Sequence, residues 1–118
     1  MNHKELDVWK RSILLIKEIY RITKEFPVSE RFGLMMQIRR SAVSITSNIA
    51  EGAARGSVKE NIHFLYYSLG SAVELEAQLI IARELNFISE NHGLDQDLQD
   101  TKRMLLGLIK HLKSQKIN

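Results

Sequence analysis

The sequence predicts an all-α protein, an antiparallel up-down-up-down four-helix bundle, and three observations lead to this prediction. Apolar residues recur at spacings of three and four along four segments, which is the helical period. No segment alternates with period two for long enough to form a strand. The connections are short, so consecutive helices must be antiparallel neighbours. The 118 residues fit a single domain, residues 1–118.

The first helix is expected at about residues 4–25. Its longest apolar row comprises Leu6, Trp9, Ile13, Ile16, Tyr20 and Thr23, and a second row beside it comprises Leu15, Ile19, Ile22 and Phe26. Together the rows are wider than a two-stranded seam, so this helix should contact more than one neighbour. Pro27 lacks the amide hydrogen that a continuing helix needs, which ends the helix there.

The second helix is expected at about residues 30–53, with Ser29 as its N-cap and Glu30 near the positive end of its dipole. Its apolar row comprises Leu34 or Met35, Ile38, Ala42, Ile45 and Ile49. Small residues are frequent between these positions, which would let another helix approach closely. Gly52 and Gly56 mark the end of the helix and the following turn.

The third helix is expected at about residues 58–86, and Ser57 with Glu60 predicts a capping box at its start. Gly70 lies in the middle of this helix and costs about 1 kcal/mol relative to alanine, which suggests a close contact with another backbone. The fourth helix is expected at about residues 94–113, after a turn at residues 91–93. It carries a heptad row of Leu94, Leu98, Thr101, Leu105, Leu108 and Leu112.

Composition excludes several classes of protein. The chain is 44% hydrophobic and 26% charged, as folded proteins are, and it has no cysteine. Disulfide scaffolds, thiolate zinc sites and cysteine nucleophiles are therefore excluded. No apolar run is long enough to span a membrane, and the first ten residues are too polar for a signal peptide, so we expect a cytoplasmic protein with no membrane partner.

No motif in the sequence predicts catalysis. Glu60 and His63 form one Glu-x-x-His pair, whereas a dinuclear metal site in a bundle needs two, and the capping box explains Glu60 better. There is no nucleophile elbow around a serine and no glycine-rich phosphate loop. We therefore expect no enzymatic activity, no metal, no cofactor and no small-molecule substrate.

A polar stripe is the unusual feature of the second and third helices. It comprises Gln37, Arg40, Ser41, Ser44, Asn48 and Glu51 on the second helix and Ser71, Glu74 and Gln78 on the third. Solvated faces usually carry lysine and glutamate, so we favour a hydrogen-bonded network or a subunit interface, with Arg40 paired to Glu51 or Glu74 because a buried charge needs a partner. The alternative is a surface for a ligand or a nucleic acid.

Charge is distributed unevenly around a net charge of +3. Residues 57–101 carry two basic and eight acidic side chains, whereas residues 102–118 carry five basic and no acidic ones. Such a basic end can bind an anionic partner, or equally an acidic segment of a neighbouring copy. The candidate nucleic-acid contacts are Arg39, Arg55, Lys102, Arg103, Lys110 and Lys113. No aromatic residue interleaves with the basic residues of the fourth helix, so base stacking is not expected there.

Several stretches of the sequence resemble a known family. They are Phe26-Pro27, Gly33-Leu34, residues 37–45, residues 47–52, Phe64-Leu65, Gly70-Ser71 and residues 74–76. The chain resembles the bacterial four-helix-bundle family of 23S ribosomal RNA intervening-sequence proteins over nearly its whole length. It departs from the family pattern at Tyr67-Ser68 and at Ala77, positions that concern packing and could alter a surface or interface.

The resemblance implies a cytoplasmic bundle that assembles with itself into a ring, typically of five subunits, and it supplies no catalytic residue. More distantly, the chain resembles the accessory variability protein of diversity-generating retroelements, a pentameric barrel that works with reverse transcriptase and RNA. Two functions follow. The first, which the resemblance favours, is an RNA-associated accessory protein; the alternative is a structural scaffold or protein-interaction module with no nucleic-acid role.

Overall fold

Four long helices and two short 3₁₀ turns make up residues 1–116, the part of the chain that this computed structural model describes. The long helices are α1 (Asp7–Thr23), α2 (Leu34–Ala54), α3 (Val58–Glu84) and α4 (His92–Lys116), and the short turns are η1 (His3–Glu5) and η2 (Val28–Glu30). No strand occurs among these residues, so the prediction of an all-α, four-helix fold is confirmed. Residues 117 and 118 of the expected domain lie outside the described range.

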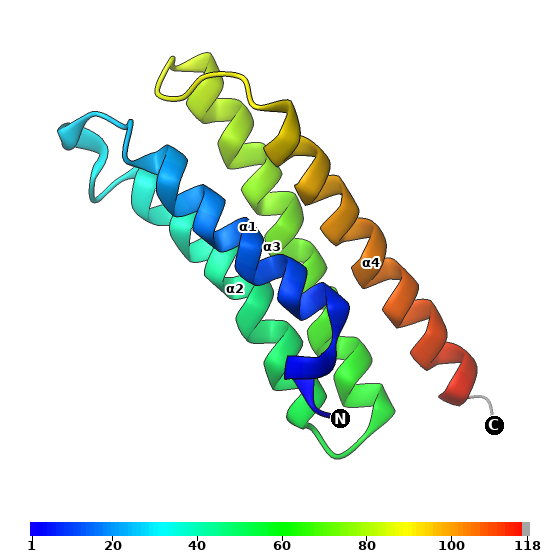
Figure 1. Cartoon of the computed structure of the whole chain (residues 1–118). Helices are drawn as coiled ribbons and strands as arrows, with labels where there is room; N and C mark the ends of the chain where they lie inside the picture. The colour runs from blue at the N-terminus through cyan, green and yellow to red at the C-terminus, as the bar shows by residue number, and fades with distance from the viewer. Residues whose placement is uncertain (117–118) are drawn as a thin grey trace.

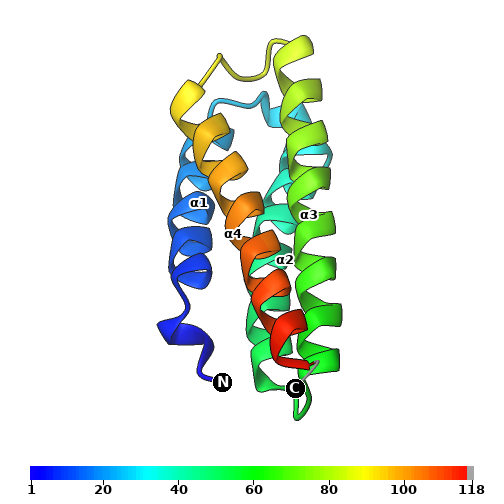
Figure 2. The same ribbon diagram turned by 90° about the vertical axis from the view of Figure 1, so that its right-hand side faces the viewer.

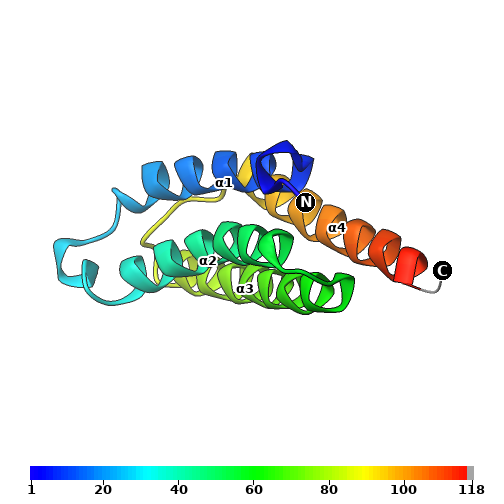
Figure 3. The ribbon, with the colours of Figure 1, turned by 90° about the horizontal axis from the view of Figure 1, so that it is seen from below.

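The helices form an elongated molecule with extents of 51 × 24 × 20 Å. The α1–α2 and α3–α4 connections lie at one end, and the α2–α3 turn lies at the other end with both termini (Figures 1 and 2). From below, α2 and α3 lie against each other as one layer, and α1 and α4 form the second layer above them (Figure 3). A feature near residue 40 and one near residue 60 are therefore far apart along the molecule.

The core runs through all four helices as one cluster of leucines and isoleucines. Its largest fully buried members are Leu15, Ile19, Ile38, Ile45, Ile49, Leu65, Leu75, Leu79, Leu94, Leu98, Leu105 and Leu112. On α1 the second apolar row, not the longer first one, faces the core: Leu15 and Ile19 are buried, whereas Trp9, Ile16 and Tyr20 remain partly or largely exposed.

Helix α1 is shorter at both ends than residues 4–25. At its start, the Asn2 side chain accepts a hydrogen bond from the Lys4 amide at 3.0 Å and stabilises a separate 3₁₀ turn. Leu6 then has an extended backbone conformation, which separates this turn from the start of α1. At its end, the Thr23 hydroxyl donates to the carbonyl of Ile19 at 2.7 Å in the last turn. The chain leaves the helix before it reaches Pro27.

The start of α2 differs from the prediction, and Ser29 is not its N-cap. Pro27 begins η2, in which the Glu30 amide donates to the Pro27 carbonyl at 2.9 Å. Helix α2 begins after Gly33, and the Glu30 carboxylate accepts a hydrogen bond from the Leu34 amide at 3.3 Å. Glu30 therefore satisfies a free amide in the first turn of α2 from outside the helix.

The caps of α3 and α4 set their bounds. The Ser57 hydroxyl accepts from the Glu60 amide at 3.1 Å, which is the serine half of the predicted capping box. Helix α3 ends at Glu84 because Asn86 adopts a left-handed φ of 60°, and the Phe87 amide donates to the Ala82 carbonyl at 2.8 Å in a Schellman motif. The expected turn at residues 91–93 instead starts α4, with the Asn91 side chain accepting from the Leu94 amide at 3.0 Å.

Two glycines have roles that differ from the predicted ones. Gly70 was expected at a close backbone contact, but a Cβ placed there would meet no described atom within 4 Å, so nothing among the described residues explains this glycine. The close approach lies at Gly52, where a Cβ would come within 2.8 Å of Asn61 Oδ1 and 2.9 Å of Phe64 Cβ. The short α2–α3 turn forces the two helices together at this point.

Candidate functional site

A hydrogen-bonded seam joins α2 to α3 and contains much of the predicted polar stripe. The Ser41 hydroxyl donates to Gln78 Oε1 at 2.9 Å, and Gln78 Nε2 donates to Glu74 Oε1 at 3.1 Å. The hydroxyls of Ser44 and Ser71 lie 2.8 Å apart. These small polar side chains satisfy one another while the two helices approach closely.

The seam continues towards the α2–α3 turn. Asn48 Nδ2 donates to the carbonyl and the hydroxyl of Ser44 at 2.9 and 3.0 Å. The fully buried Ser68 hydroxyl donates to the Ile45 carbonyl at 2.7 Å. The sequence did not predict this contact, because a serine hydroxyl can bond to many kinds of polar group. The seam is thus an internal contact of this chain.

Gln37, Arg40 and Glu51 lie outside the seam. Gln37 and Arg40 are exposed, and Glu51 accepts from the Arg55 guanidinium at 2.6 Å. Among residues 1–116, no carboxylate forms an ion pair with Arg40, so the pairing expected with Glu51 or Glu74 is not formed within the chain. Consecutive side chains of an α-helix point about 100° apart around its axis. Because Ser41 points into the seam, its neighbour Arg40 points outside it.

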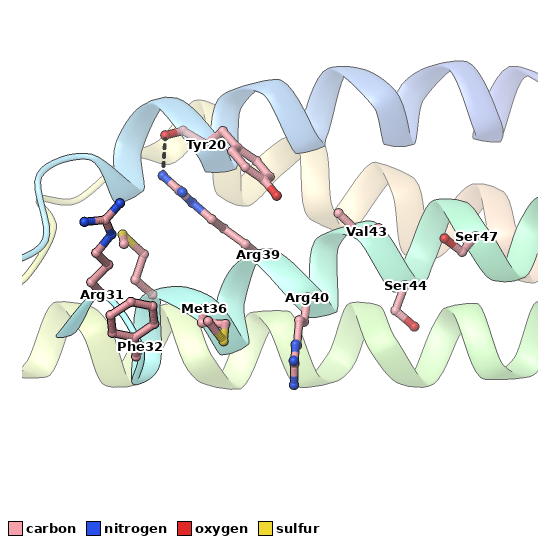
Figure 4. A pocket seen from close by; sticks show the side chains of 10 residues that line it. Tyr20, Arg31, Phe32, Met36, Arg39, Arg40, Val43, Ser44 and Ser47 are labelled. Atoms are coloured by element: carbon pink, nitrogen blue, oxygen red, sulfur yellow. Dashed lines mark hydrogen bonds between the residues drawn. The ribbon is translucent and has the colours of Figure 1, made fainter.

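A groove of about 630 Å³ lies beside Arg40, between α1, the segment that joins η2 to α2, and the first part of α2 (Figure 4). Its lining residues are Tyr20, Arg31, Phe32, Met35, Met36, Arg39, Arg40, Val43, Ser44 and Ser47. We call this surface the arginine groove. It combines apolar and sulfur-containing side chains with three arginines, and none of these ten lining residues is acidic.

Two arginines of the groove lie against aromatic rings. The Arg39 guanidinium lies 4.4 Å from the centre of the Tyr20 ring and donates to the Thr23 hydroxyl at 2.9 Å, and Figure 4 shows its bond to the Tyr20 carbonyl. Arg31 lies 5.8 Å from the ring of Phe32, which is itself 79% exposed. Arg40 points away from Tyr20, towards the α3 side of the groove (Figure 4). The groove is therefore cationic at its rim and apolar inside.

The predicted nucleic-acid contacts do not form one surface. Lys102 pairs with Glu76 at 3.2 Å, and Arg103 pairs with Asp100 at 3.0 Å, so their charges are compensated locally. Arg39 belongs to the arginine groove. The two remaining lysines of α4, Lys110 and Lys113, are exposed near the end of that helix, and Arg55 lies at the α2–α3 turn.

Basic and aromatic side chains gather where the α2–α3 turn meets the end of α4. Lys113 Nζ donates to the Tyr66 hydroxyl at 2.7 Å, with its ammonium 5.1 Å from the ring centre, and the Arg55 guanidinium lies 4.7 Å from the ring of Phe64. We call this surface the basic–aromatic end. It comprises Arg55, Lys59, His63, Phe64, Tyr66, Tyr67 and Lys113.

Five members of the basic–aromatic end were not predicted as contacts: Lys59, His63, Phe64, Tyr66 and Tyr67. His63 lies 2.6 Å from the Tyr67 hydroxyl, and both side chains are exposed. The spacing from Lys59 to His63 to Tyr67 is four residues, which places all three on one helical face, so the sequence contained this signal. The contact of Tyr66 with Lys113 joins residues 47 positions apart and could be found only from the fold.

One cluster of side chains outside these two surfaces has the composition of a metal site. Ligand atoms of Glu90, His92 and Asp95 lie within 4.8 Å of one another. Arg83 pairs with Asp95 at 2.8 Å, however, which leaves only two exposed ligands, too few for a typical metal site. Glu18 on α1 lies away from both surfaces named above. Two hydrogen bonds from Arg21 lower the pKa of its carboxyl below the ordinary value.

No described helix is long and apolar enough to cross a membrane.

The family stretches map onto these features. Residues 37–52 supply one side of the seam and much of the arginine groove, and residues 64–76 supply the other side of the seam and part of the basic–aromatic end.

Comparison with known proteins assigns the family. The sequence matches the model of the 23S rRNA-intervening sequence protein over residues 4–107. The structure is similar to the crystal structure of a protein with unknown function from the S23 ribosomal protein family of Bacteroides thetaiotaomicron VPI-5482, with a TM-score of 0.81 and 25% sequence identity over 93% of this chain and 99% of that one. No curated protein is similar enough to match. The chain therefore belongs to the family of 23S rRNA-intervening sequence proteins.

Proposed function

We propose that this protein is a non-enzymatic, RNA-associated accessory factor of the cytoplasm that binds RNA through its basic–aromatic end. In this proposal, bundles of up-down-up-down topology assemble into a ring, with five copies as the expected number. The observation that carries the proposal is the set of cations held against aromatic rings, above all Lys113 on Tyr66 and Arg55 on Phe64.

The chemistry of this end suits RNA that contains unpaired bases. Lysine and arginine attract phosphates, and exposed tyrosine rings provide stacking surfaces for bases that are not already paired. Lys59, Lys110 and Lys113 are exposed, and none of them forms an ion pair with a described carboxylate. Repetition of the same surface around a ring would multiply contacts that are weak individually.

The experiment measures binding to an RNA hairpin with an unpaired loop and to duplex DNA at several salt concentrations. We expect the hairpin to bind more tightly, with affinity that falls steeply as salt increases. Replacing Lys59, Lys110 and Lys113 together by alanine should reduce the slope of log K against log salt by about 2 to 3, because each lost phosphate contact accounts for roughly 0.7 to 0.9.

The matched control replaces Lys102 and Arg103 by alanine, since their charges are already compensated by Glu76 and Asp100. This double variant should retain most of the salt dependence. If the wild-type protein binds neither nucleic acid at low salt, where electrostatic attraction is strongest, the RNA proposal fails.

The second candidate function is a scaffold that binds protein partners and no nucleic acid. One observation favours it: the arginine groove is lined by the exposed Phe32 and Val43 and by two half-buried methionines, and apolar surface of this kind is typical of protein–protein contacts.

A further inference from the structure

Helix α3 exposes an apolar outer face along its C-terminal half. Val73, Ile80 and Ile81 are 49%, 53% and 47% exposed, and Ala77 is exposed between them. Because the opposite side of α3 is packed in the core, this helix carries apolar residues around its whole circumference. A helix of that kind is normally covered on all sides.

Two glutamates lie on the same face. Glu74 and Glu84 are both exposed, and neither forms an ion pair with a basic side chain of residues 1–115. Glu74 accepts only from the neutral Gln78 amide at 3.1 Å. We call the surface from Val73 to Glu84, with these two carboxylates, the α3 docking face.

We propose that the arginine groove of one copy receives the α3 docking face of a second copy. This inference rests on the self-assembly included in the proposed function, and it names the two surfaces that meet. The groove presents three arginines and no acidic lining residue, whereas the docking face presents two carboxylates without basic partners, so the charges are complementary.

The sizes and apolar contents of the two surfaces also agree. Residues 35–47 along the groove span about 18 Å, and residues 73–84 of the docking face span about 17 Å, at 1.5 Å per helical residue. The groove offers Met35, Met36 and Val43 to the isoleucines of the face. Methionine adapts its shape readily to an incoming apolar side chain.

Gly70 gains an explanation from this arrangement. It lies one helical turn before Val73 and has no described atom near the position of a Cβ, yet it weakens the middle of a helix. A neighbouring copy that passes over the docking face would approach the α3 backbone closely there.

The contact is heterologous, because the groove and the face are different surfaces. Each copy therefore offers both surfaces, and successive copies can add in the same direction until a ring closes. The N-terminal half of α3 carries Lys59, His63 and Tyr67 and stays outside the docking face. RNA binding at the basic–aromatic end and docking at the groove can thus be tested separately.

The test uses two variants, Arg40→Glu in the groove and Ile80→Lys in the docking face, measured by size-exclusion chromatography with light scattering. The first places a carboxylate opposite Glu74 and Glu84, and the second places an ammonium against three arginines. Each variant alone should fall from the oligomeric mass of the wild-type protein towards the monomer mass of 13.6 kDa. Both positions are exposed, so helical circular dichroism should be unchanged.

Mixing the two variants provides the decisive observation. The intact groove of the Ile80→Lys copy can bind the intact face of the Arg40→Glu copy, and the two altered surfaces carry opposite introduced charges, so they can also attract each other. The mixture should therefore form complexes of at least twice the monomer mass. A mixture that stays monomeric overturns the proposal.

The matched controls are Arg103→Glu and Leu14→Lys, which make the same changes at exposed positions of α4 and α1. Both should retain the wild-type mass. If the wild-type protein is itself monomeric at micromolar concentration, the proposed self-assembly fails. If it is oligomeric and Arg40→Glu or Ile80→Lys leaves the mass unchanged, only the docking proposal fails. Loss of RNA binding by Arg40→Glu at unchanged mass would make the groove a nucleic-acid surface and would also overturn the docking proposal.

Discussion

Arg40 and Gly52 illustrate how single residues of this protein depend on their neighbours. The two lie on the same helix, yet Arg40 is exposed without a described carboxylate partner, whereas Gly52 is buried against α3. A charged residue in a row of small polar residues suggested a buried pair, but the rotation of one position along the helix places Arg40 outside the seam. The glycine, which suggested only a helix end, lies where α3 packs tightly against α2.

The Gly52 contact predicts a clear difference between two glycine substitutions. Gly52→Ala should destabilise the protein by about 1 to 3 kcal/mol, because the added methyl group would overlap Asn61 and Phe64. Gly107→Ala on α4 is the control: nothing lies within 4 Å of its Cβ position, so the substitution should stabilise the helix by about 0.5 to 1 kcal/mol. Urea unfolding of both variants would measure the two changes, and equal effects would contradict the prediction.

Ion pairs show what a sequence can and cannot reveal about a charged surface. Arg103 and Asp100 are three residues apart, so helical spacing alone could have removed Arg103 from the candidate nucleic-acid contacts. Arg55 likewise pairs with Glu51 four residues away, but its guanidinium also lies against Phe64 at the basic–aromatic end. The pair between Lys102 and Glu76 joins α4 to α3 across 26 positions and required the fold. Local spacing therefore predicts only part of the surface charge.

At the scale of elements, helix bounds depend on caps that the pattern of apolar residues does not contain. Helical periodicity located all four long helices, because each buries a regular stripe in the core. It did not locate the start of α2, since Glu30 reaches forward to cap the helix from within a 3₁₀ turn. The left-handed Asn86 likewise ends α3 two residues early, at a position where asparagine substitutes for glycine.

The seam between α2 and α3 predicts energetic coupling between these elements. Ser41→Ala and Gln78→Ala should each destabilise the protein by about 1 to 3 kcal/mol, because each leaves a buried polar partner without its hydrogen bond. The double variant should cost less than the sum of the single variants by about 0.5 to 1.5 kcal/mol. A double-mutant cycle by thermal or urea unfolding measures this coupling, and strict additivity would show that the hydrogen bond contributes nothing.

At the scale of the whole molecule, the fold was the most predictable property and the surfaces were the least. Four amphipathic segments joined by short connections leave few all-α arrangements, so the fold class followed from periodicity and length. The arginine groove combines α1, α2 and the segment that joins η2 to α2, and the basic–aromatic end combines the α2–α3 turn, α3 and α4. Surfaces that draw on three elements depend on how these elements pack, which no local pattern in the sequence records.

The three-residue turn between α2 and α3 has a consequence for the order of folding. A short loop loses little chain entropy when it closes, and α2 and α3 also make the most extensive contact between any two helices described. We therefore expect the α2–α3 hairpin to form the folding nucleus, with α1 and α4 docking after the rate-limiting step. Core substitutions such as Ile45→Val and Leu65→Ala should give φ-values well above those of Ile19→Val and Leu105→Ala in stopped-flow kinetics. Equal φ-values in all four helices would instead indicate a nucleus spread over the whole bundle.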